Sequence, residues 1–106
     1  MKLYFKTEDP ERLKVNIIEF IESKELLTWS IVKSDGVKYL KHTKQWGKKG
    51  VIKLIIDQKT GHVVSEVLKF KNVTDEVKDF QGYYLGRFCE LMLVNFFERF
   101  SRIDKK

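Results

Sequence analysis

Hydrophobic and polar residues repeat with two different periods along this chain, and the two periods separate helices from strands. From Leu13 onward the apolar residues recur every three or four positions, which places them on one face of a helix. Asp9 and Pro10 precede this run, and these residue types suit the N-cap and the first turn of a helix. The pattern predicts a helix over residues 10–24, and the alternation in residues 2–6 predicts a short strand before it.

Four further segments have the patterns of strands. Residues 27–33 and 62–71 alternate with a period of two, residues 51–57 are rich in β-branched residues, and residues 37–42 would return after a tight turn. In chain order, the first two are separated by Asp35 and Gly36, a pair that accepts the positive φ angles of a tight hairpin turn. Connections this short join antiparallel neighbours. The sequence therefore predicts antiparallel hairpins built from residues 27–33, 37–42, 51–57 and 62–71.

A second helical pattern occupies the last third of the chain. It is predicted to begin after Asn72 or Thr74, either of which can cap it, and to continue to about Arg102. Gly82 and Gly86 interrupt it, and each costs up to about 1 kcal/mol against alanine in a helix. Apolar residues occupy nearly every side of this helix, so we expect it to be buried on all sides, in part by a second copy of the chain in a homodimer.

These elements predict an α+β fold. Short connections favour one antiparallel sheet of four strands, or five if residues 2–6 join it, with the N-terminal and the long C-terminal helix on one face in a two-layer sandwich. A length of 106 residues is typical of one domain, so we expect residues 1–106 to form a single unit.

Composition places the chain among ordinary globular proteins, with 42% hydrophobic and 34% charged residues. Cys89 is the single cysteine, so no internal disulfide can form. The N-terminus has no apolar signal region, and no run approaches 18 apolar residues, so we expect a cytoplasmic protein without a membrane span. The two histidines and one cysteine show no metal-ligand spacing, and we expect neither a metal nor a cofactor.

The positive charge of the chain is concentrated in its middle. Residues 33–71 contain ten lysines and three acids, a net charge of +7, whereas eleven basic and twelve acidic residues elsewhere leave −1. Within that span, the stretch over residues 43–50 has two glycines and no periodicity and is predicted to be a loop. Lysines mixed with aromatic rings favour contact with nucleic acid or an acidic protein surface. The candidate binding residues are Lys41, His42, Lys44, Trp46, Lys48 and Lys49.

Other interpretations of the same residues remain open. Lysine without arginine is also typical of a solvated sheet face and of a protected sheet edge. A small RNA-cleaving enzyme would use His42 as acid or base, with Lys41, Glu66 or Arg87 close by. An adaptor or inhibitor that masks one partner protein is a third hypothesis. His62 follows a turn and is expected to be solvated.

Several short islands of sequence resemble an uncharacterised family of small bacterial proteins. They are Thr28-Trp29, then His42-Thr43-x-Gln45-Trp46, then Tyr84-x-Gly86-Arg87-Phe88-x-Glu90-Leu91-x-Leu93 with several phenylalanines after it. The resemblance implies a bacterial origin. It implies no activity, because the family has no established function. Arg87 and Glu90 are three residues apart on the predicted helix, a spacing that favours a local ion pair.

Overall fold

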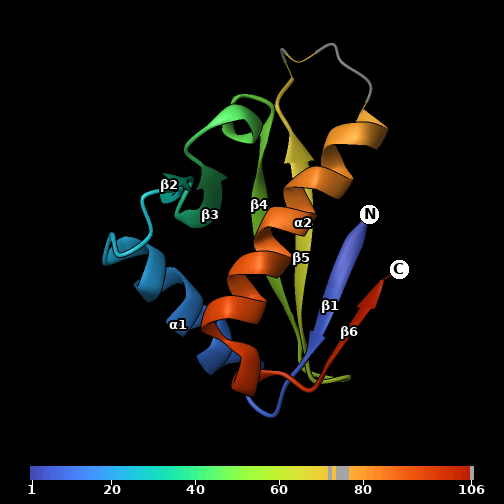
Figure 1. Cartoon of the computed structure of the whole chain (residues 1–106). Coiled ribbons are helices and arrows are strands. Elements are labelled where there is room, and N and C mark those ends of the chain that lie inside the picture. The colour runs from blue at the N-terminus through green and yellow to red at the C-terminus, as the bar shows by residue number, and fades with distance from the viewer. Residues whose placement is uncertain (72, 74–76, 106) are drawn as a thin grey trace.

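The computed structural model describes residues 1–71, 73 and 77–105 and shows a two-layer α+β arrangement (Figure 1). Both helices cover the same face of one sheet. In chain order the elements are β1 (Lys2–Lys6), α1 (Pro10–Glu22), β2 (Trp29–Ser34), β3 (Val37–His42), the 3-10 turn η1 (Gln45–Lys48), β4 (Gly50–Asp57), β5 (His62–Lys69), α2 (Val77–Asn95), the 3-10 turn η2 (Phe97–Arg99) and β6 (Arg102–Lys105).

The sheet contains six strands in the order β2-β3-β4-β5-β1-β6, and every neighbouring pair is antiparallel. The predicted fold class is thus confirmed. The predicted number of four or five strands is wrong. The hairpin turns form where the sequence predicts them, since Asp35 and Gly36 have φ angles of 51° and 79°.

The end of the predicted C-terminal helix is not α-helical, and a sixth strand follows it. The sequence predicts a helix that continues to Arg102, but α2 ends at Asn95 and the chain becomes extended at Phe100. β6 contains one apolar residue, Ile103, so its pattern is too weak to predict a strand. The strand exists because β1 offers an open edge, to which Ser101 donates the first hydrogen bond, from its N–H to the Lys6 carbonyl oxygen at 2.8 Å.

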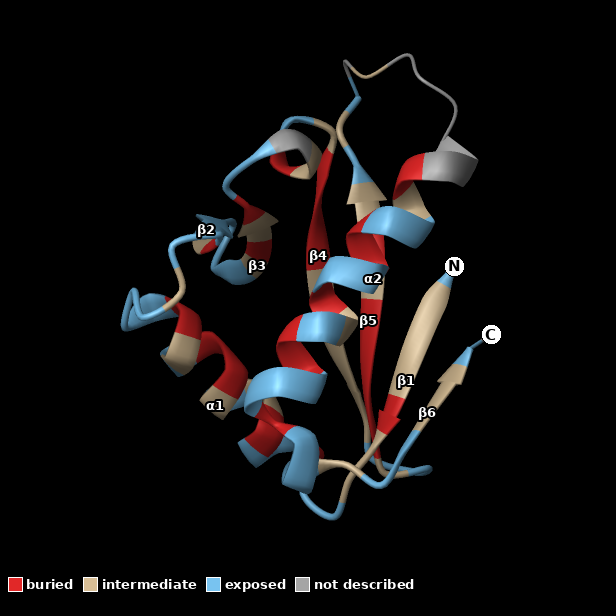
Figure 2. Ribbon diagram, viewed as in Figure 1, coloured by how far each residue is buried: buried red, intermediate tan, exposed pale blue. Residues whose placement is uncertain are grey.

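One hydrophobic core lies between the sheet and the two helices (Figure 2). Leu13, with no exposed surface, faces inward from α1 as the sequence predicts, and Asp9 caps that helix by accepting a hydrogen bond from the Arg12 backbone N–H at 3.1 Å. Phe5 of β1 and Phe88 of α2 meet edge to face with ring centroids 5.6 Å apart. These contacts hold α2 across the middle of the sheet.

Within a single chain the C-terminal helix is not buried on all sides, so the remainder of the predicted burial would have to come from the second copy. Tyr83, Val94 and Phe97 are 64%, 74% and 67% exposed, whereas Phe88 is fully buried. α2 therefore has a buried side and a solvent side that still carries apolar residues.

The predicted caps Asn72 and Thr74 lie outside the described residues. None of the helices in the described part of the chain is long and apolar enough to cross a membrane.

Candidate functional site

A cavity of about 260 Å³ lies where the start of β2, the end of β3, η1 and the middle of α2 meet. Three stretches that are far apart in the sequence contribute its walls. The start of β2 and the residue before it contribute two side chains, the β3–η1 segment three and α2 two. The lining residues are Thr28, Trp29, His42, Lys44, Trp46, Arg87 and Glu90.

Tyr84 of α2 binds the ends of β3 and β4 next to the cavity through two buried hydrogen bonds. Its hydroxyl accepts from the His42 backbone N–H at 3.0 Å and donates to the Gly50 carbonyl oxygen at 2.9 Å. Burial raises the pKa of Tyr84 to about 12, so the hydroxyl keeps the proton that it donates. Because His42 directly precedes the predicted loop and Gly50 is its last residue, one side chain fixes both ends of the loop against the helix.

Aromatic rings form the walls of the cavity. The Trp29 ring lies edge to face against the His42 ring, with centroids 5.2 Å apart. Trp46 stacks on Tyr83 with centroids 5.3 Å apart and planes 2° from parallel. This stacking fixes η1, which carries Trp46, against the solvent side of α2. The cavity is shaped by rigid side chains as well as by the loop backbone.

His42 is neutral at neutral pH and has one nitrogen already engaged. Burial lowers its pKa below the ordinary value of 6.5, and the positive charges of Arg87 and Lys44 lower it further. Its Nδ1 accepts a long hydrogen bond, 3.4 Å, from the Lys44 backbone N–H. A neutral imidazole that accepts at Nδ1 carries its proton at Nε2 and offers a donor there. The ring is therefore better suited to holding an acceptor than to removing a proton.

Removal of the Arg87 charge is expected to raise the pKa of His42. In Arg87→Gln the buried ring loses one of the two positive charges that disfavour its protonation. The measurement is a proton NMR titration of the two histidines. Arg12→Gln, a matched loss of charge on the exposed side of α1, should leave the pKa of His42 where it is. An unchanged value in Arg87→Gln would show that Arg87 does not face the ring in solution.

The charges around the cavity are mainly positive. Lys44 and Arg87 line it together with one carboxylate, Glu90. Arg87 Nη1 lies 3.4 Å from Glu90 Oε2, so the predicted local ion pair is confirmed. Both side chains are more than half exposed, and exposed pairs of this kind stabilise a fold by at most about 1 kcal/mol. Arg87 thus remains available to a ligand.

The structure brings only part of the predicted set together. His42, Lys44 and Trp46 line the cavity with Arg87, whereas the other predicted binding residues do not. Lys41 lies on the opposite face of β3 from His42, where its Nζ is 6.0 Å from the Phe70 ring centroid. Lys48 is exposed in η1, and Lys49 Nζ lies 5.8 Å from the centroid of Phe80.

Glu66, a candidate partner of His42, also lies away from the cavity. It belongs to β5 and forms an ion pair with Lys2 at 3.4 Å on the open face of the sheet. Periodicity alone did not identify Thr28, Trp29 and Glu90 as lining residues. All three belong to the islands that carry the family resemblance, and those islands meet at this cavity.

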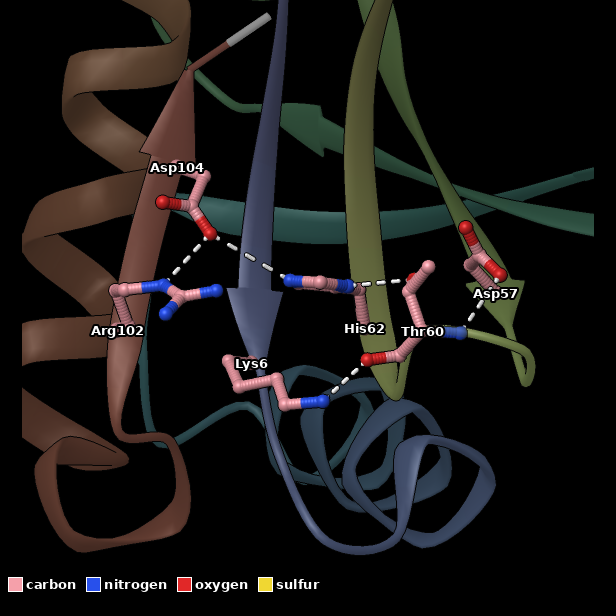
Figure 3. Close-up of polar contacts among 6 residues, drawn as sticks. All are labelled: Lys6, Asp57, Thr60, His62, Arg102 and Asp104. Carbon is pink, nitrogen blue, oxygen red and sulfur yellow. Dashed lines mark hydrogen bonds and ion pairs between the residues drawn. The ribbon is translucent and has the colours of Figure 1, made fainter.

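A second polar cluster surrounds His62 on the open face of the sheet (Figure 3). The expectation that His62 is solvated is wrong, because the residue is only 7% exposed. Its Nδ1 is 2.7 Å from the Thr60 hydroxyl, and its Nε2 is 3.5 Å from Asp104 Oδ2. Arg102 Nε donates to the same carboxylate oxygen at 2.9 Å. The cluster joins β5 to the edge strand β6 across β1.

Loss of the Asp104 carboxylate is expected to lower stability in a pH-dependent way. The hydrogen bond from Arg102 lowers the pKa of Asp104. A carboxylate with a lowered folded pKa stabilises the fold above its unfolded pKa of about 3.9, and that contribution is lost as the pH falls through the folded value. Asp104→Asn should therefore melt at a lower temperature than the wild type at pH 7, and the difference should shrink below about pH 4.

Asp35→Asn is the matched control for this prediction. Asp35 is exposed in a turn, where asparagine also accepts the positive φ angle. Its melting temperature should follow the wild type at every pH. A difference between Asp104→Asn and the wild type that stayed constant down to pH 2 would contradict the proposed role of the charge.

A larger cavity, of about 720 Å³, lies between the β1–α1 connection, α1 and η2, but its chemistry points to no ligand class. Its three basic and three acidic side chains balance, and Arg99 is already bound to Asn16 at 3.0 Å. Across residues 1–71, 73 and 77–105, no three His, Cys, Asp or Glu side chains are grouped to hold a metal ion. The cavity lined by His42 is the better candidate.

Comparison of the chain with protein-family models, with curated proteins and with solved structures found no match. The fold and the cavity thus define the protein as a two-layer α+β protein with a small, mainly cationic cavity between its sheet and its second helix.

Proposed function

We propose that this protein is a non-catalytic, cytoplasmic binding module that holds a phosphate group of single-stranded nucleic acid in the cavity lined by His42. The observation that carries the proposal is the convergence of Lys44, Arg87 and the His42 ring on one cavity with a single carboxylate. We further propose that the module is a homodimer joined through α2.

The size of the cavity favours a polymer over a free small molecule. A volume of about 260 Å³ lies below the range of about 300–1,000 Å³ typical of pockets for whole small ligands. One anionic group of a longer chain would enter, while the rest of the chain follows the surface past exposed Lys48. Phosphate oxygens accept from lysine and arginine donors in most nucleic-acid interfaces, and these contacts carry no sequence preference.

The experiment is a fluorescence-anisotropy titration of labelled single-stranded RNA and DNA at several salt concentrations. We expect the logarithm of the binding constant to fall linearly with the logarithm of salt concentration. Lys44→Gln should weaken binding to all sequences and reduce the slope by about one. Lys59→Gln removes the same charge from the β4–β5 turn, which lies at the opposite end of β4 from η1, and should leave binding unchanged.

Three outcomes would overturn this function. Failure to bind any oligonucleotide at low salt would remove the nucleic-acid proposal. Binding of poly-glutamate in place of the oligonucleotides would redirect it to an acidic protein surface. Equal losses in Lys44→Gln and Lys59→Gln would show that net charge binds the polymer and that the cavity is not involved.

RNA cleavage is the second candidate, because His42 and Arg87 do line one cavity. The engagement of Nδ1 and the position of Glu66 argue against it. In the same titrations we expect RNA to stay intact. Cleavage of RNA but not of DNA, lost in His42→Ala, would replace the binding module with an enzyme that uses the ribose hydroxyl.

We also propose that the chain belongs to the uncharacterised bacterial family that its islands resemble. The meeting of the three islands at one cavity supports this, since Thr28, Trp46 and Arg87 come from different islands. An adaptor or inhibitor of a partner protein is the alternative to be tested if no nucleic acid binds.

A further inference from the structure

Exposed segments recur from turn to turn along α2 (Figure 2), and the exposed residues on its solvent side are here called the α2 stripe. Its members recur at helical spacing, and all of them are exposed. They include two glycines, two charged residues and three large side chains, of which Leu93 is 46% and Val94 is 74% exposed. The α2 stripe consists of Gly82, Tyr83, Gly86, Arg87, Glu90, Leu93 and Val94.

The two halves of the α2 stripe have opposite shapes. At Gly82 and Gly86, one turn apart, a side chain would meet nothing within 4 Å, so the helix surface there is bare and open. Tyr83, which lies between them in sequence, stacks on Trp46 toward the cavity. The other half presents the exposed side chains of Leu93 and Val94. We call the bare helix surface at the two glycines the notch, and Leu93 and Val94 form a ridge of a shape that would lie over such a surface.

The two charged residues of the α2 stripe are arranged symmetrically about one point near its middle. Arg87 and Glu90 lie equally far from the point between Phe88 and Cys89, and so do Tyr83 and Val94. If a second α2 lies antiparallel about a two-fold axis at that point, each Arg87 faces a Glu90. The same rotation brings Leu93 and Val94 of one copy level with residues 83–84 of the other, between its two glycines.

We propose that two copies of this chain pair through the α2 stripe in this antiparallel arrangement. This single two-fold rotation makes the two surfaces complementary in both shape and charge, as an isologous interface requires. Parallel helices would instead place like charges and equal shapes opposite each other. Because Arg87 and Glu90 also line the cavity, the second copy supplies an arginine and a carboxylate to the mouth of each site. The proposal rests on the homodimer proposed above and specifies its geometry.

The test is a mixing experiment with two charge-reversal variants, measured by sedimentation velocity without nucleic acid. The wild type should form dimers as its concentration rises. Arg87→Glu places two acids on the α2 stripe and Glu90→Arg two bases, so each variant alone should dimerise at least about tenfold more weakly. Mixed in equal amounts, they should form a heterodimer, because both cross-pairs are then attractive. An ion pair within one helix cannot produce this rescue.

The glycines supply an independent readout. Gly86→Ala should raise the melting temperature of the dilute monomer, because alanine favours the helix, and should weaken the dimer about tenfold by filling the notch. A wild type that stays monomeric at millimolar concentration would overturn the proposal. So would the absence of a heterodimer in the mixture. Nucleic-acid binding is tested separately with Lys44→Gln, which lies outside the α2 stripe, so either proposal can fail without the other.

Discussion

Replacement of Tyr84 by phenylalanine is expected to lower the free energy of unfolding by about 2–6 kcal/mol, although it removes only one oxygen atom. The reason is that two buried backbone groups lose their partner at once, the N–H of His42 and the carbonyl of Gly50. An unpaired buried donor or acceptor costs about 1–3 kcal/mol. Urea denaturation followed by circular dichroism measures the change.

The same variant should also loosen the candidate site, since Tyr84 holds both ends of the segment that carries Lys44 and Trp46. Tyr83→Phe is the matched control. It removes the same atom from the next residue, whose side chain is mainly exposed, and should leave stability unchanged. Equal stability of the two variants would mean that the Tyr84 hydroxyl is not paired in solution as it is here.

Substitution of Gly47 by alanine is expected to cost about 3 kcal/mol, the upper end of the range for overpacking. An added Cβ would lie 1.7 Å from the His42 carbonyl oxygen and 2.9 Å from its carbon. Both atoms are backbone, so no side-chain rotation relieves the clash. η1 must move away from β3, which separates Trp46 from His42. Binding of single-stranded nucleic acid should therefore fall together with stability.

Gly82→Ala is the control for this substitution. It is the same chemical change at a helix position where the new carbon meets nothing within 4 Å. At concentrations where the chain is monomeric, it should stabilise the protein by up to about 1 kcal/mol. Effects of the same sign in the two variants would contradict the close approach of Gly47 to β3.

Local signals in the sequence predict most of the fold because the interactions behind them are local. Asp9 caps α1 through the backbone only three residues away, and the Asp35-Gly36 turn depends on the φ angles of those two residues. The β-branched residues of β4 and the alternation in β5 are likewise carried by each strand's own residues. The α+β class and the two helices could be derived from such signals.

The end of α2 and the presence of β6 could not be derived in this way. Phe96 and Phe100 continue the helical spacing beyond Asn95, so the pattern shows no end. Phe100 instead packs edge to face on Phe5 with ring centroids 5.3 Å apart, and the chain then pairs with β1. The hydrogen bonds that β6 gains at the open edge of β1, more than 95 positions earlier in the chain, outweigh the local preference for a longer helix.

In the candidate site, too, some features follow from the local sequence and others from contacts between distant segments. The sequence by itself determined which residue types were present, and it singled out His42, Lys44, Trp46 and Arg87 by their chemistry. Only the tertiary structure decided that these four line one cavity while Glu66 lies on the open face of the sheet. The physical reason is that sheet order and the Tyr84 hydrogen bonds set distances between segments, and no segment encodes these distances alone.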